Sequence, residues 1–318
     1  MAALASRSIG LSLLSTFYFV VFLLHPSYFL LLKTMAEGHA VIRWARALRE
    51  LVDEPLVAVR LPARWGERPQ TLLGQHIASI HTHGKVLLLH LSGGETLLCH
   101  AMQYGSWQVG AVDMLLRKDP KYVRLRLVTT QHEAVFYHGP IIELLSPTEL
   151  ALSERLHTLG PDVMHAEFDR DEAWNRLIQH PDQPIGDLVL NQRVMAGIGN
   201  IYKSEGLFLA AIDPRLPASA VSREQLERYW DAVIPLMWEG TTRFGRTTTL
   251  PAPLQHDGNT RWVYQRKGKP CLRCGSKIVM IRQGVNERAT YFCPRCQVLG
   301  IRDSGLAHCD EINVAILL

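Results

Sequence analysis

Four cysteines near the carboxyl end of the chain have the spacing of metal ligands. Two residues separate the members of each pair and eighteen residues separate the pairs, which are Cys271, Cys274, Cys293 and Cys296. Two residues between thiolates let both sulfurs reach one tetrahedral ion from a tight turn, and the second pair completes the shell. Because four sulfurs leave no open position, we predict one structural Zn²⁺ without a catalytic role. The alternative is four free or buried cysteines.

The segment between the two cysteine pairs has the pattern of a hairpin. Strands are predicted over Lys277–Ile281 and Thr290–Phe292, with a polar turn over residues 283–288 between them. Arg288 would lie near the tip of this β-hairpin zinc finger. An arginine in a turn is most often solvated, but a guanidinium also forks onto phosphate oxygens or enters a minor groove. Arg288 is therefore a candidate nucleic-acid contact.

A turn with two glycines, Gly197 and Gly199, lies between two predicted helices. The first helix is Ile185–Met195, and Asn200 opens the second. Glycine lets a backbone approach another group closely, and a helix start presents unpaired N–H groups to an anion. A phosphate is the natural ligand of such a turn. A tight connection between helices that binds nothing is the alternative.

The remaining pattern places these candidates on three kinds of structure. Apolar residues recur at helical spacing over 41–52, and residues 56–145 change to alternation and short apolar runs. A hairpin signal at Ser92-Gly93-Gly94 joins two of the predicted strands, and strands at this spacing predict a β-sandwich behind one leading helix. Residues 147–239 have helical signals. The predicted strands of the sandwich are 86–91, 96–100, 122–128 and 134–137, and the predicted helices of the next part are 148–159, 172–178, 185–195, 201–211 and 223–237.

We therefore predict an α+β multidomain protein with an N-terminal β-sandwich and leading helix, a helical domain and a C-terminal zinc finger. The predicted boundaries are a hydrophobic leader over 1–34, the sandwich over 35–146, the helical domain over 147–256, the finger over 257–298 and a tail over 299–318.

The composition is that of an ordinary folded protein. The chain has 318 residues, of which 47% are hydrophobic and 20% charged, so it is not a disordered protein. Its net charge of +4 is weak support for a polyanionic partner. Only Cys99 and Cys309 lie outside the cysteine cluster. A secreted disulfide scaffold would be shorter and would spread its cysteines, so the pattern favours metal binding in a reducing compartment.

Residues 9–32 form an apolar stretch that is long enough to cross a bilayer, although His25-Pro26 interrupts it. It would be a signal sequence or an anchor if it is translated. No small-x-small cleavage site follows it closely, which weakens the first interpretation. The interpretation that we favour is that the true start is Met35.

Taken together, these residues resemble the formamidopyrimidine-DNA glycosylase / endonuclease VIII family. The resemblance covers essentially everything from Met35 to Gln297, in the order and spacing of the family. The matching pieces are MAEGHAV at 35–41, HGKVLLLHL at 83–91, HAMQYGSWQV at 100–109, GPDVM at 160–164, VMAGIGNIYKSE at 194–205 and RATYFCPRCQ at 288–297.

The resemblance implies a fold and a set of DNA contacts. The family fold is a two-layered β-sandwich, a helix–two-turn–helix domain and a zinc finger, with DNA in the cleft between them. Asn200 and the turn of Gly197 and Gly199 would hold phosphates beside the lesion, and Arg288 would do so from the finger. The stretch HAMQYGSW is similar to the endonuclease VIII branch, whose three-residue wedge fills the gap left by the extruded base. The wedge here would be Met102, Gln103 and Tyr104, and without the flanking matches it would be an ordinary loop.

The chemistry implied by the resemblance needs an amine that attacks the anomeric carbon of the sugar. An amine can displace the base and then form an imine, an electron sink that enables β-elimination of the 3′ phosphate. A lysine side chain has a pKa of about 10.4, whereas a terminal α-amine lies at about 7.7–8.0 and is partly unprotonated at neutral pH. Position 36 carries such an amine only if translation starts at Met35 and the methionine is removed.

The family nucleophile is an N-terminal proline followed by a glutamate, and this chain departs from that pattern with Ala36 before Glu37. We hypothesise that Ala36 attacks as a primary amine, that Glu37 handles protons at the ribose ring oxygen and the imine, and that Lys85 orients the lesion phosphate or sugar. Lys85 is also the fallback amine. Apart from the resemblance, Glu37 and Lys85 would be a carboxylate in an N-terminal turn and a lysine at a strand end.

Three functional readings follow. The leading one is a bifunctional glycosylase and abasic-site lyase that removes oxidised bases, with oxidised pyrimidines expected from the wedge, since the target base must leave the stack. The second is a DNA-binding relative with weakened catalysis, motivated by the missing proline. The third, a membrane-tethered zinc protein, rests only on residues 9–32. For the first we expect a monomer on double-stranded DNA with an oxidised base or abasic site, in the cytoplasm at the nucleoid, and no membrane association if Met35 is the start.

Overall fold

The computed structural model describes residues 36–62, 65–66, 68–242, 248–255 and 258–298. All of these residues belong to one compact unit. The predicted leader over 1–34 and the tail over 299–318 lie outside the described residues. Among the described residues no helix has the length and apolar character to span a bilayer.

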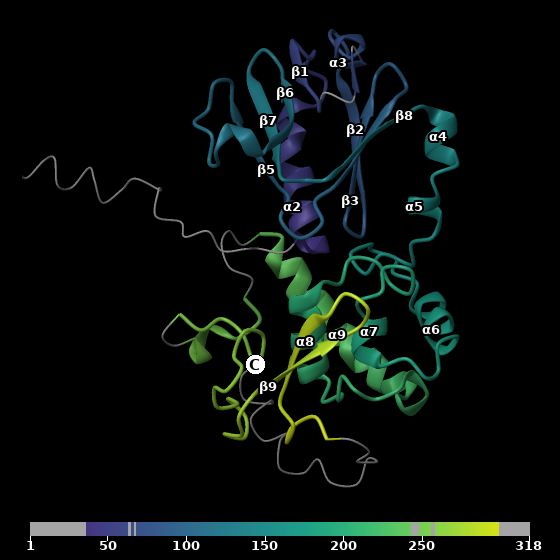
Figure 1. Cartoon of the computed structure of the whole chain (residues 1–318), viewed down its shortest axis with the longest axis vertical. Coiled ribbons are helices and arrows are strands. Elements are labelled where there is room, and N and C mark those ends of the chain that lie inside the picture. Colours follow the sequence, from purple (N-terminus) through teal and green to yellow (C-terminus); the bar gives the residue numbers. More distant parts are fainter. Residues whose placement is uncertain (1–35, 63–64, 67, 243–247, 256–257, 299–318) are drawn as a thin grey trace, which may run out of the picture. The chain divides into compact units, whose positions relative to one another are not determined.

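The amino-terminal part is a sandwich of two four-stranded antiparallel sheets (Figure 1). One sheet has the order β2-β3-β4-β8 and the other the order β1-β6-β7-β5. The strands are β1 (Ala58–Arg60), β2 (Ile77–His83), β3 (Val86–Leu91), β4 (Thr96–His100), β5 (Ser106–Ala111), β6 (Val123–Val128), β7 (His132–Tyr137) and β8 (Ile141–Leu145). Burial alternates along β6 and β8, so that one face of each sheet turns toward a shared core, whereas β4 and β7 are buried at nearly every position.

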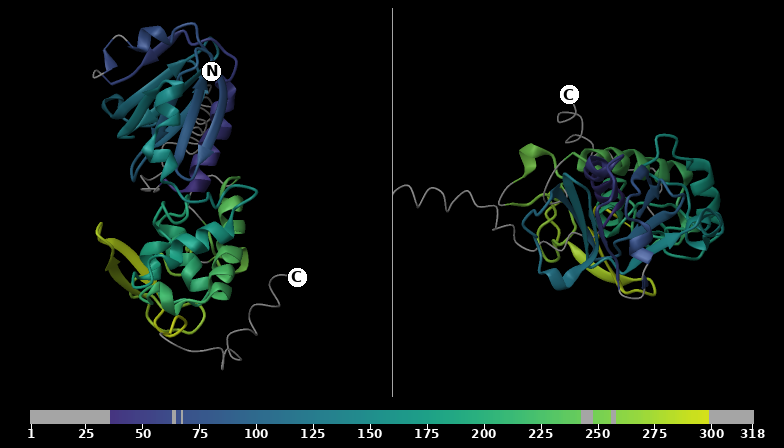
Figure 2. Two further views of the ribbon diagram at one scale, coloured as in Figure 1. Left: turned by 90° about the vertical axis from the view of Figure 1, so that its right-hand side faces the viewer. Right: turned by 90° about the horizontal axis from the view of Figure 1, so that it is seen from above.

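Helix α2 (Gly38–Leu48) lies lengthwise along the strands and contacts both sheets (Figure 2). Its apolar face, which includes Val41 and Leu48, joins the sandwich core around Leu89, Leu97 and Phe136. The short helices η2 (Arg49–Leu51), α3 (Arg68–Thr71) and η4 (Pro120–Tyr122) complete this part. The leading helix and the sandwich are therefore as predicted.

The second part is helical and has a core of its own around Tyr202, Tyr229 and Trp230. Its helices are α4 (Pro147–Ala151), α5 (Glu154–His157), α6 (Arg170–Ile178), α7 (Ile185–Leu188), α8 (Asn200–Leu209), η5 (Ala218–Ala220), α9 (Arg223–Gly240) and η6 (Ala252–Leu254). The predicted helix 148–159 is instead two short helices. Ser146 caps the first helix in a capping box with Glu149. Leu152 and Ser153 are not helical and separate it from the second helix.

The predicted helix Ile185–Met195 is also wrong in length, since α7 ends at Leu188. Asn191 and Gln192 cause the difference because their side chains replace helical hydrogen bonds. Asn191 Oδ1 accepts from Arg193 N at 3.0 Å, and Gln192 Nε2 donates to Ile198 O at 3.0 Å. The chain therefore makes two turns between α7 and α8.

The carboxyl-terminal part contains the hairpin of β9 (Val279–Gln283) and β10 (Arg288–Phe292). The start of each strand differs by two residues from the prediction. β9 begins at Val279, two residues later than predicted, and β10 begins at Arg288, two residues earlier. A small core joins this part to α8, with Phe208 packed among Trp262, Val263 and Ile278.

One buried carboxylate ties α8 to the segment that leads into the finger. Glu205 has no exposed surface, and it accepts hydrogen bonds from the backbone N–H groups of Trp262, Val263 and Tyr264 at 2.7–2.8 Å. Three backbone donors thus depend on one side chain.

Glu205→Ala should therefore lower the free energy of unfolding by about 3 kcal/mol or more, since each buried donor left without an acceptor costs about 1–3 kcal/mol. Urea unfolding followed by fluorescence measures this change. The matched control is Glu167→Ala, an exposed position, for which we expect a change within about 0.5 kcal/mol. Equal unfolding energies for the two variants would contradict the structural role of Glu205.

Candidate functional site

Glu37 is the most constrained residue among the predicted catalytic positions. It has no exposed surface, directly precedes α2 and lies at the amino end of α8. Its Oε1 accepts from Ile201 N at 2.8 Å and its Oε2 from Tyr202 N at 3.4 Å. Helix starts have unpaired N–H groups and a positive dipole end, so a carboxylate is well placed there. Burial raises the pKa of the Glu37 carboxyl, while Lys85 and the two amides act in the opposite direction.

The two glycines of the predicted phosphate turn let the Glu37 segment approach α8. Gly38 N donates to Gly197 O at 2.9 Å, and Gly197 adopts a φ of +104°, which favours glycine. A Cβ on Gly199 would lie 2.4 Å from Glu37 Cδ. The group that accepts the hydrogen bonds of the Ile201 and Tyr202 N–H groups is thus the carboxylate of Glu37, not a phosphate. A phosphate contact by Gly197 and Gly199 stays a prediction.

Lys85 follows a turn that is tied to the helical part. Gly84, with a φ of +57°, donates its N–H to Asp162 Oδ2 at 2.8 Å, and Asp162 Oδ1 accepts from Met164 N at 2.9 Å. One buried carboxylate therefore fixes the turn that carries Lys85. Burial lowers the pKa of Lys85 to about 8, with Glu37 opposing the shift and Arg288 adding to it. Lys85 is thus close enough to both Glu37 and Arg288 to interact with them electrostatically. Ala36, which is 5% exposed, directly precedes Glu37.

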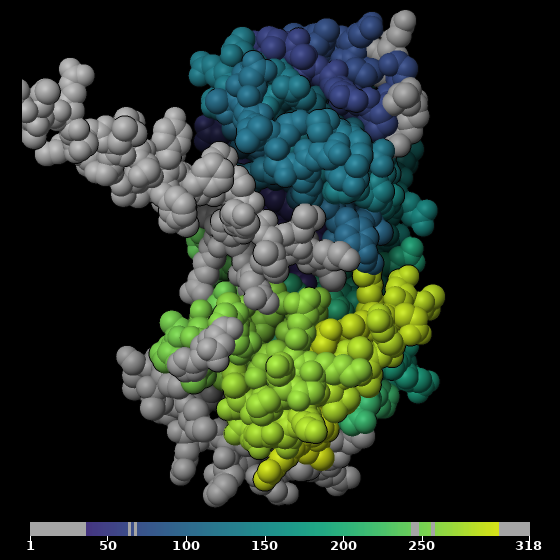
Figure 3. Space-filling view, turned by 60° about the vertical axis from the view of Figure 1, so that its left-hand side comes forward, coloured from purple at the N-terminus to yellow at the C-terminus, as the bar shows by residue number. Residues whose placement is uncertain are grey.

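The predicted wedge is the loop between β4 and β5. Met102 is 46% and Tyr104 is 59% exposed, which is unusual for large apolar side chains. With the amide of Gln103 turned so that its oxygen faces the guanidinium, Oε1 accepts from both terminal nitrogens of Arg288, at 2.7 Å from Nη2. In the space-filling view the hairpin atoms, in yellow, adjoin sandwich atoms in blue (Figure 3). The structure therefore brings the wedge and the finger arginine together.

Asn200 and Lys203 on α8 hold the strand that begins with Arg288. Asn200 is 3% exposed, and its Nδ2 donates to Ala289 O at 2.6 Å. Lys203 has no exposed surface, and its Nζ donates to Thr290 Oγ1 at 2.8 Å. Burial lowers the pKa of Lys203 to about 8. Sequence reasoning missed Lys203, although its place one turn after Asn200 could have indicated a shared helix face.

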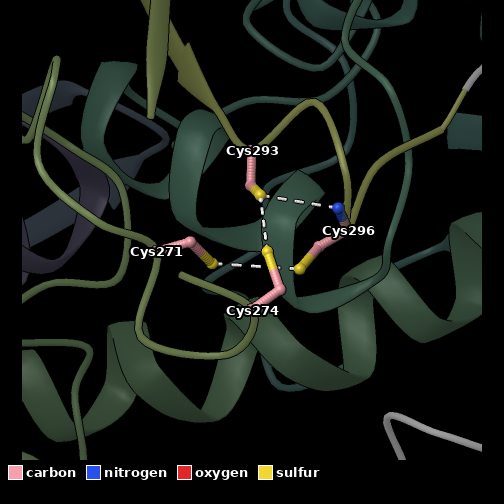
Figure 4. Close-up of side chains that lie close together, drawn as sticks. All are labelled: Cys271, Cys274, Cys293 and Cys296. Atoms are coloured by element: carbon pink, nitrogen blue, oxygen red, sulfur yellow. Dashed lines mark hydrogen bonds between the residues drawn. The ribbon is translucent and has the colours of Figure 1, made fainter. Parts of the chain in front are cut away.

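The four cysteines converge as the spacing predicts (Figure 4). Their Sγ atoms all lie within 4.8 Å of one another, with 3.8 Å between Cys271 and Cys296 and 3.5 Å between Cys274 and Cys293. Tetrahedral Zn–S bonds of about 2.3 Å place neighbouring sulfurs about 3.8 Å apart. The donor set and the spacing therefore fit one Zn²⁺ with no open coordination position.

Three family models match the chain in order. They are the formamidopyrimidine-DNA glycosylase N-terminal domain at residues 35–140, its H2TH domain at 159–251, and a zinc finger found in FPG and IleRS at 268–298. A protein of Streptomyces coelicolor named probable endonuclease 8 2 is 34% identical over 269 residues, which cover 83% of this chain and 94% of that protein. The chain belongs to the formamidopyrimidine-DNA glycosylase / endonuclease VIII family.

A second relative and a solved structure are also similar to this chain. A protein of Mycolicibacterium smegmatis named DNA-(apurinic or apyrimidinic site) lyase Nei2 is 32% identical, over 83% of this chain and 99% of its own length. The Lactococcus lactis Fpg, solved in complex with DNA that contains an abasic site, has the same fold with a TM-score of 0.68 at 24% identity, over 82% of this chain and 99% of that one. The predicted family, fold class and structural zinc are confirmed.

In this family member, two buried side chains with positioning roles escaped the sequence analysis. Lys203 lies within the quoted stretch VMAGIGNIYKSE, and Asp162 within GPDVM. Asp162 could not be assigned because its partner Gly84 is 78 residues away in the sequence. The described geometry does not by itself establish the DNA contacts of Asn200, Arg288 and the wedge, which stay predictions.

Loss of one cysteine should remove the metal. Cys293→Ser is expected to reduce zinc from one equivalent per chain to well below one, because three thiolates no longer close the tetrahedral shell. Atomic absorption on the purified protein measures the metal. Cys99→Ala, outside the cluster, is the control and should keep its zinc. A Cys293→Ser protein with a full equivalent of zinc would refute the four-sulfur site.

The contact between Gly199 and Glu37 can be tested by a double-mutant cycle. Gly199→Ala should lower the free energy of unfolding by about 2 kcal/mol, because the added Cβ overlaps the Glu37 side chain. In a Glu37→Ala background the same substitution should cost at least about 1 kcal/mol less, since the overlapping atoms are gone. Denaturant unfolding of the four proteins gives the coupling energy. The same penalty in both backgrounds would show that another contact is responsible.

Proposed function

We propose that this chain is a bifunctional DNA glycosylase and abasic-site lyase, which excises an oxidised base and then incises the strand through an imine. The observation that carries the proposal is the burial of Glu37, next to Ala36 in the chain, against the start of α8, with Lys85 within electrostatic range of Glu37. A carboxyl with a raised pKa and a lysine with a lowered pKa are the groups that acid–base chemistry requires. The names of the relatives, endonuclease 8 and abasic-site lyase, support the same activity.

The reaction begins at the nitrogen of Ala36. Its lone pair attacks C1′ of the deoxyribose, the N-glycosidic bond breaks, and the base leaves with a proton. The bond between C1′ and the ring oxygen then breaks, that oxygen takes a proton, and C1′ becomes an imine with Ala36. Loss of a proton from C2′ breaks the bond between C3′ and its phosphate oxygen. Water hydrolyses the imine and returns the free amine.

Glu37 is the group that we assign to these proton transfers. Its buried carboxyl has a raised pKa, so it can hold a proton for the ring oxygen and later accept one near the imine. Lys85 is assigned to the lesion phosphate or sugar, because its turn is fixed by Asp162 and its side chain lies near Glu37. Glu37 and Lys85 thus have different tasks in the same centre.

The proposal requires translation from Met35, because Ala36 otherwise carries an amide. The match to the N-terminal domain of the family begins at residue 35. Alanine is small enough for removal of the preceding methionine. It supplies a primary amine in place of the family's proline, whose imine is permanently charged and whose ring fixes the angle of attack. We expect base excision to be slowed more than strand incision.

The DNA contacts complete the proposal. Met102, Gln103 and Tyr104 fill the gap left by the extruded base, and their similarity to the endonuclease VIII wedge favours oxidised pyrimidines. Arg288, Asn200 and the turn of Gly197 and Gly199 hold phosphates beside the lesion. If translation starts at Met35, the protein acts as a monomer on double-stranded DNA in the cytoplasm, at the nucleoid. The domain boundaries at 35–146, 147–256 and 257–298 are part of the same proposal.

Borohydride trapping tests the proposal on abasic-site duplex DNA. Protein that begins at Ala36 should become covalently linked to the DNA. Protein that retains residues 1–35 should not, because the nitrogen of Ala36 is then part of a peptide bond. Glu37→Gln should slow trapping by about 10²–10⁴-fold, the usual contribution of a proton-transferring group. Lys85→Ala should retain trapping at a reduced rate. Complete loss with Lys85→Ala, together with trapping by the extended protein, would assign the nucleophile to Lys85.

A second function is favoured by Ala36 itself. Without the ring of proline, the chain would be a protein that binds damaged or abasic DNA with weakened catalysis. The same experiment separates the two, because a binding protein would retain the duplex in a gel shift and yet form no covalent product with borohydride.

A further inference from the structure

The wedge loop crosses from one sheet of the sandwich to the other. It begins after His100 in β4, which is paired with Val86 directly after Lys85. It ends at Ser106 in β5, which is paired with Tyr137 in β7. Lys85 thus flanks the wedge on the side of the β2-β3-β4-β8 sheet. On its other side the wedge is flanked by one end of the β1-β6-β7-β5 sheet, here called the second sheet. At that end Tyr137 also pairs with Val123.

Three basic side chains gather at that end of the second sheet. Lys118 Nζ donates to Ser106 Oγ at 2.9 Å, which places the ammonium directly beside the end of the wedge loop. Arg124 is exposed and follows Val123 in β6. His138 follows Tyr137, and burial lowers its pKa, with Lys118 and Arg124 lowering it further. His138 therefore lies within electrostatic range of both Lys118 and Arg124, and the three residues are here named the second-sheet cluster.

A buried glutamine fixes the loop that carries Lys118. Gln108 is 6% exposed, and its Nε2 donates to Leu115 O at 2.9 Å. Its Oε1 accepts from Arg117 N at 2.9 Å and from the Tyr137 hydroxyl at 2.8 Å. Three hydrogen bonds to one side chain hold residues 115–117 against β5 and β7. The ammonium of Lys118 is thus held in place before any ligand binds, which lowers the entropic cost of binding.

The cluster has no neutralising partner among the described residues. No carboxylate there lies within 4.0 Å of Lys118 or Arg124, whereas their neighbours are paired, Lys121 with Asp119 and Arg126 with Glu133. The uncompensated cations of Lys118 and Arg124 favour a polyanion, and a DNA backbone phosphate fits their charge and their hydrogen-bond donors.

We propose that Lys118, Arg124 and His138 bind backbone phosphates of the DNA strand opposite the lesion. The inference rests on the proposed function and adds a strand-specific contact to it. Lys85 and Glu37 act on the lesion strand from one side of the wedge. Because the wedge fills the gap in the lesion strand, it meets the base that has lost its partner, and we assign the sheet end on the other side of the wedge to the complement.

The test is binding of the double variant Lys118→Gln/Arg124→Gln to DNA that contains tetrahydrofuran, an abasic analogue that is not cleaved. On duplex DNA its affinity should fall about tenfold or more near physiological salt, and the slope of log K against log salt should fall by about 1.8 for two lost phosphate contacts. On the single-stranded oligonucleotide with the same analogue, its affinity should equal that of the wild type. The matched control is Arg49→Gln/Arg60→Gln, which removes two charges from exposed positions elsewhere on the sandwich and should leave the duplex affinity unchanged.

A second measurement identifies the strand. Neutral methylphosphonates in the opposite strand should weaken wild-type binding and have little further effect on the double variant. The inference would be overturned if the double variant lost equal affinity for the duplex and for the single strand, or if its affinity for the duplex were unchanged. Failure of the wild type itself to bind the duplex would overturn the proposed function as well, so the two failures are distinguishable.

Discussion

The rest of the site depends on the carboxylate of Glu37 at the amino end of α8. The chain's first described residues and a helix more than 160 residues later are joined there by hydrogen bonds to Ile201 and Tyr202. The helix start needs an acceptor, and the carboxylate needs donors once it is buried, so each satisfies the other. Because Ala36 is adjacent in the chain, the same contact fixes the place of the proposed nucleophile.

Two further buried side chains extend this arrangement. Asp162 ties the Lys85 turn to the helical part through Gly84, and Lys203 ties α8 to the strand that begins with Arg288. Both are ionisable groups that burial would disfavour without partners, and each has hydrogen-bond partners on another element. The proposed catalytic residues Glu37 and Lys85 and the proposed DNA contact Arg288 are therefore held relative to α8 and the turn that precedes it.

Much of this organisation could be predicted from the sequence, because local patterns determine it. The cysteine spacing is a property of two tight turns. The short apolar runs on either side of Ser92-Gly93-Gly94 predicted the bounds of β3 and β4 as the structure has them. The errors have local causes too. The sequence predicted a helix through Asn191 and Gln192, but in the structure their side chains form hydrogen bonds with backbone groups. The missing Cβ of Gly199 makes room for Glu37, a role that the sequence analysis did not assign to this glycine. That contact, like the one between Gly84 and Asp162, joins residues too distant in sequence for any periodic pattern to indicate.

The central claim is that the backbone nitrogen of Ala36 forms the covalent bond to deoxyribose. The most direct measurement is peptide mapping by mass spectrometry of the product trapped with borohydride on abasic-site DNA. The account predicts that the reduced sugar remnant is attached to the α-nitrogen of a peptide that begins with Ala36. A sugar remnant on the side chain of Lys85 would contradict this claim. So would a native protein that retains residues upstream of Met35 and carries the remnant at another position.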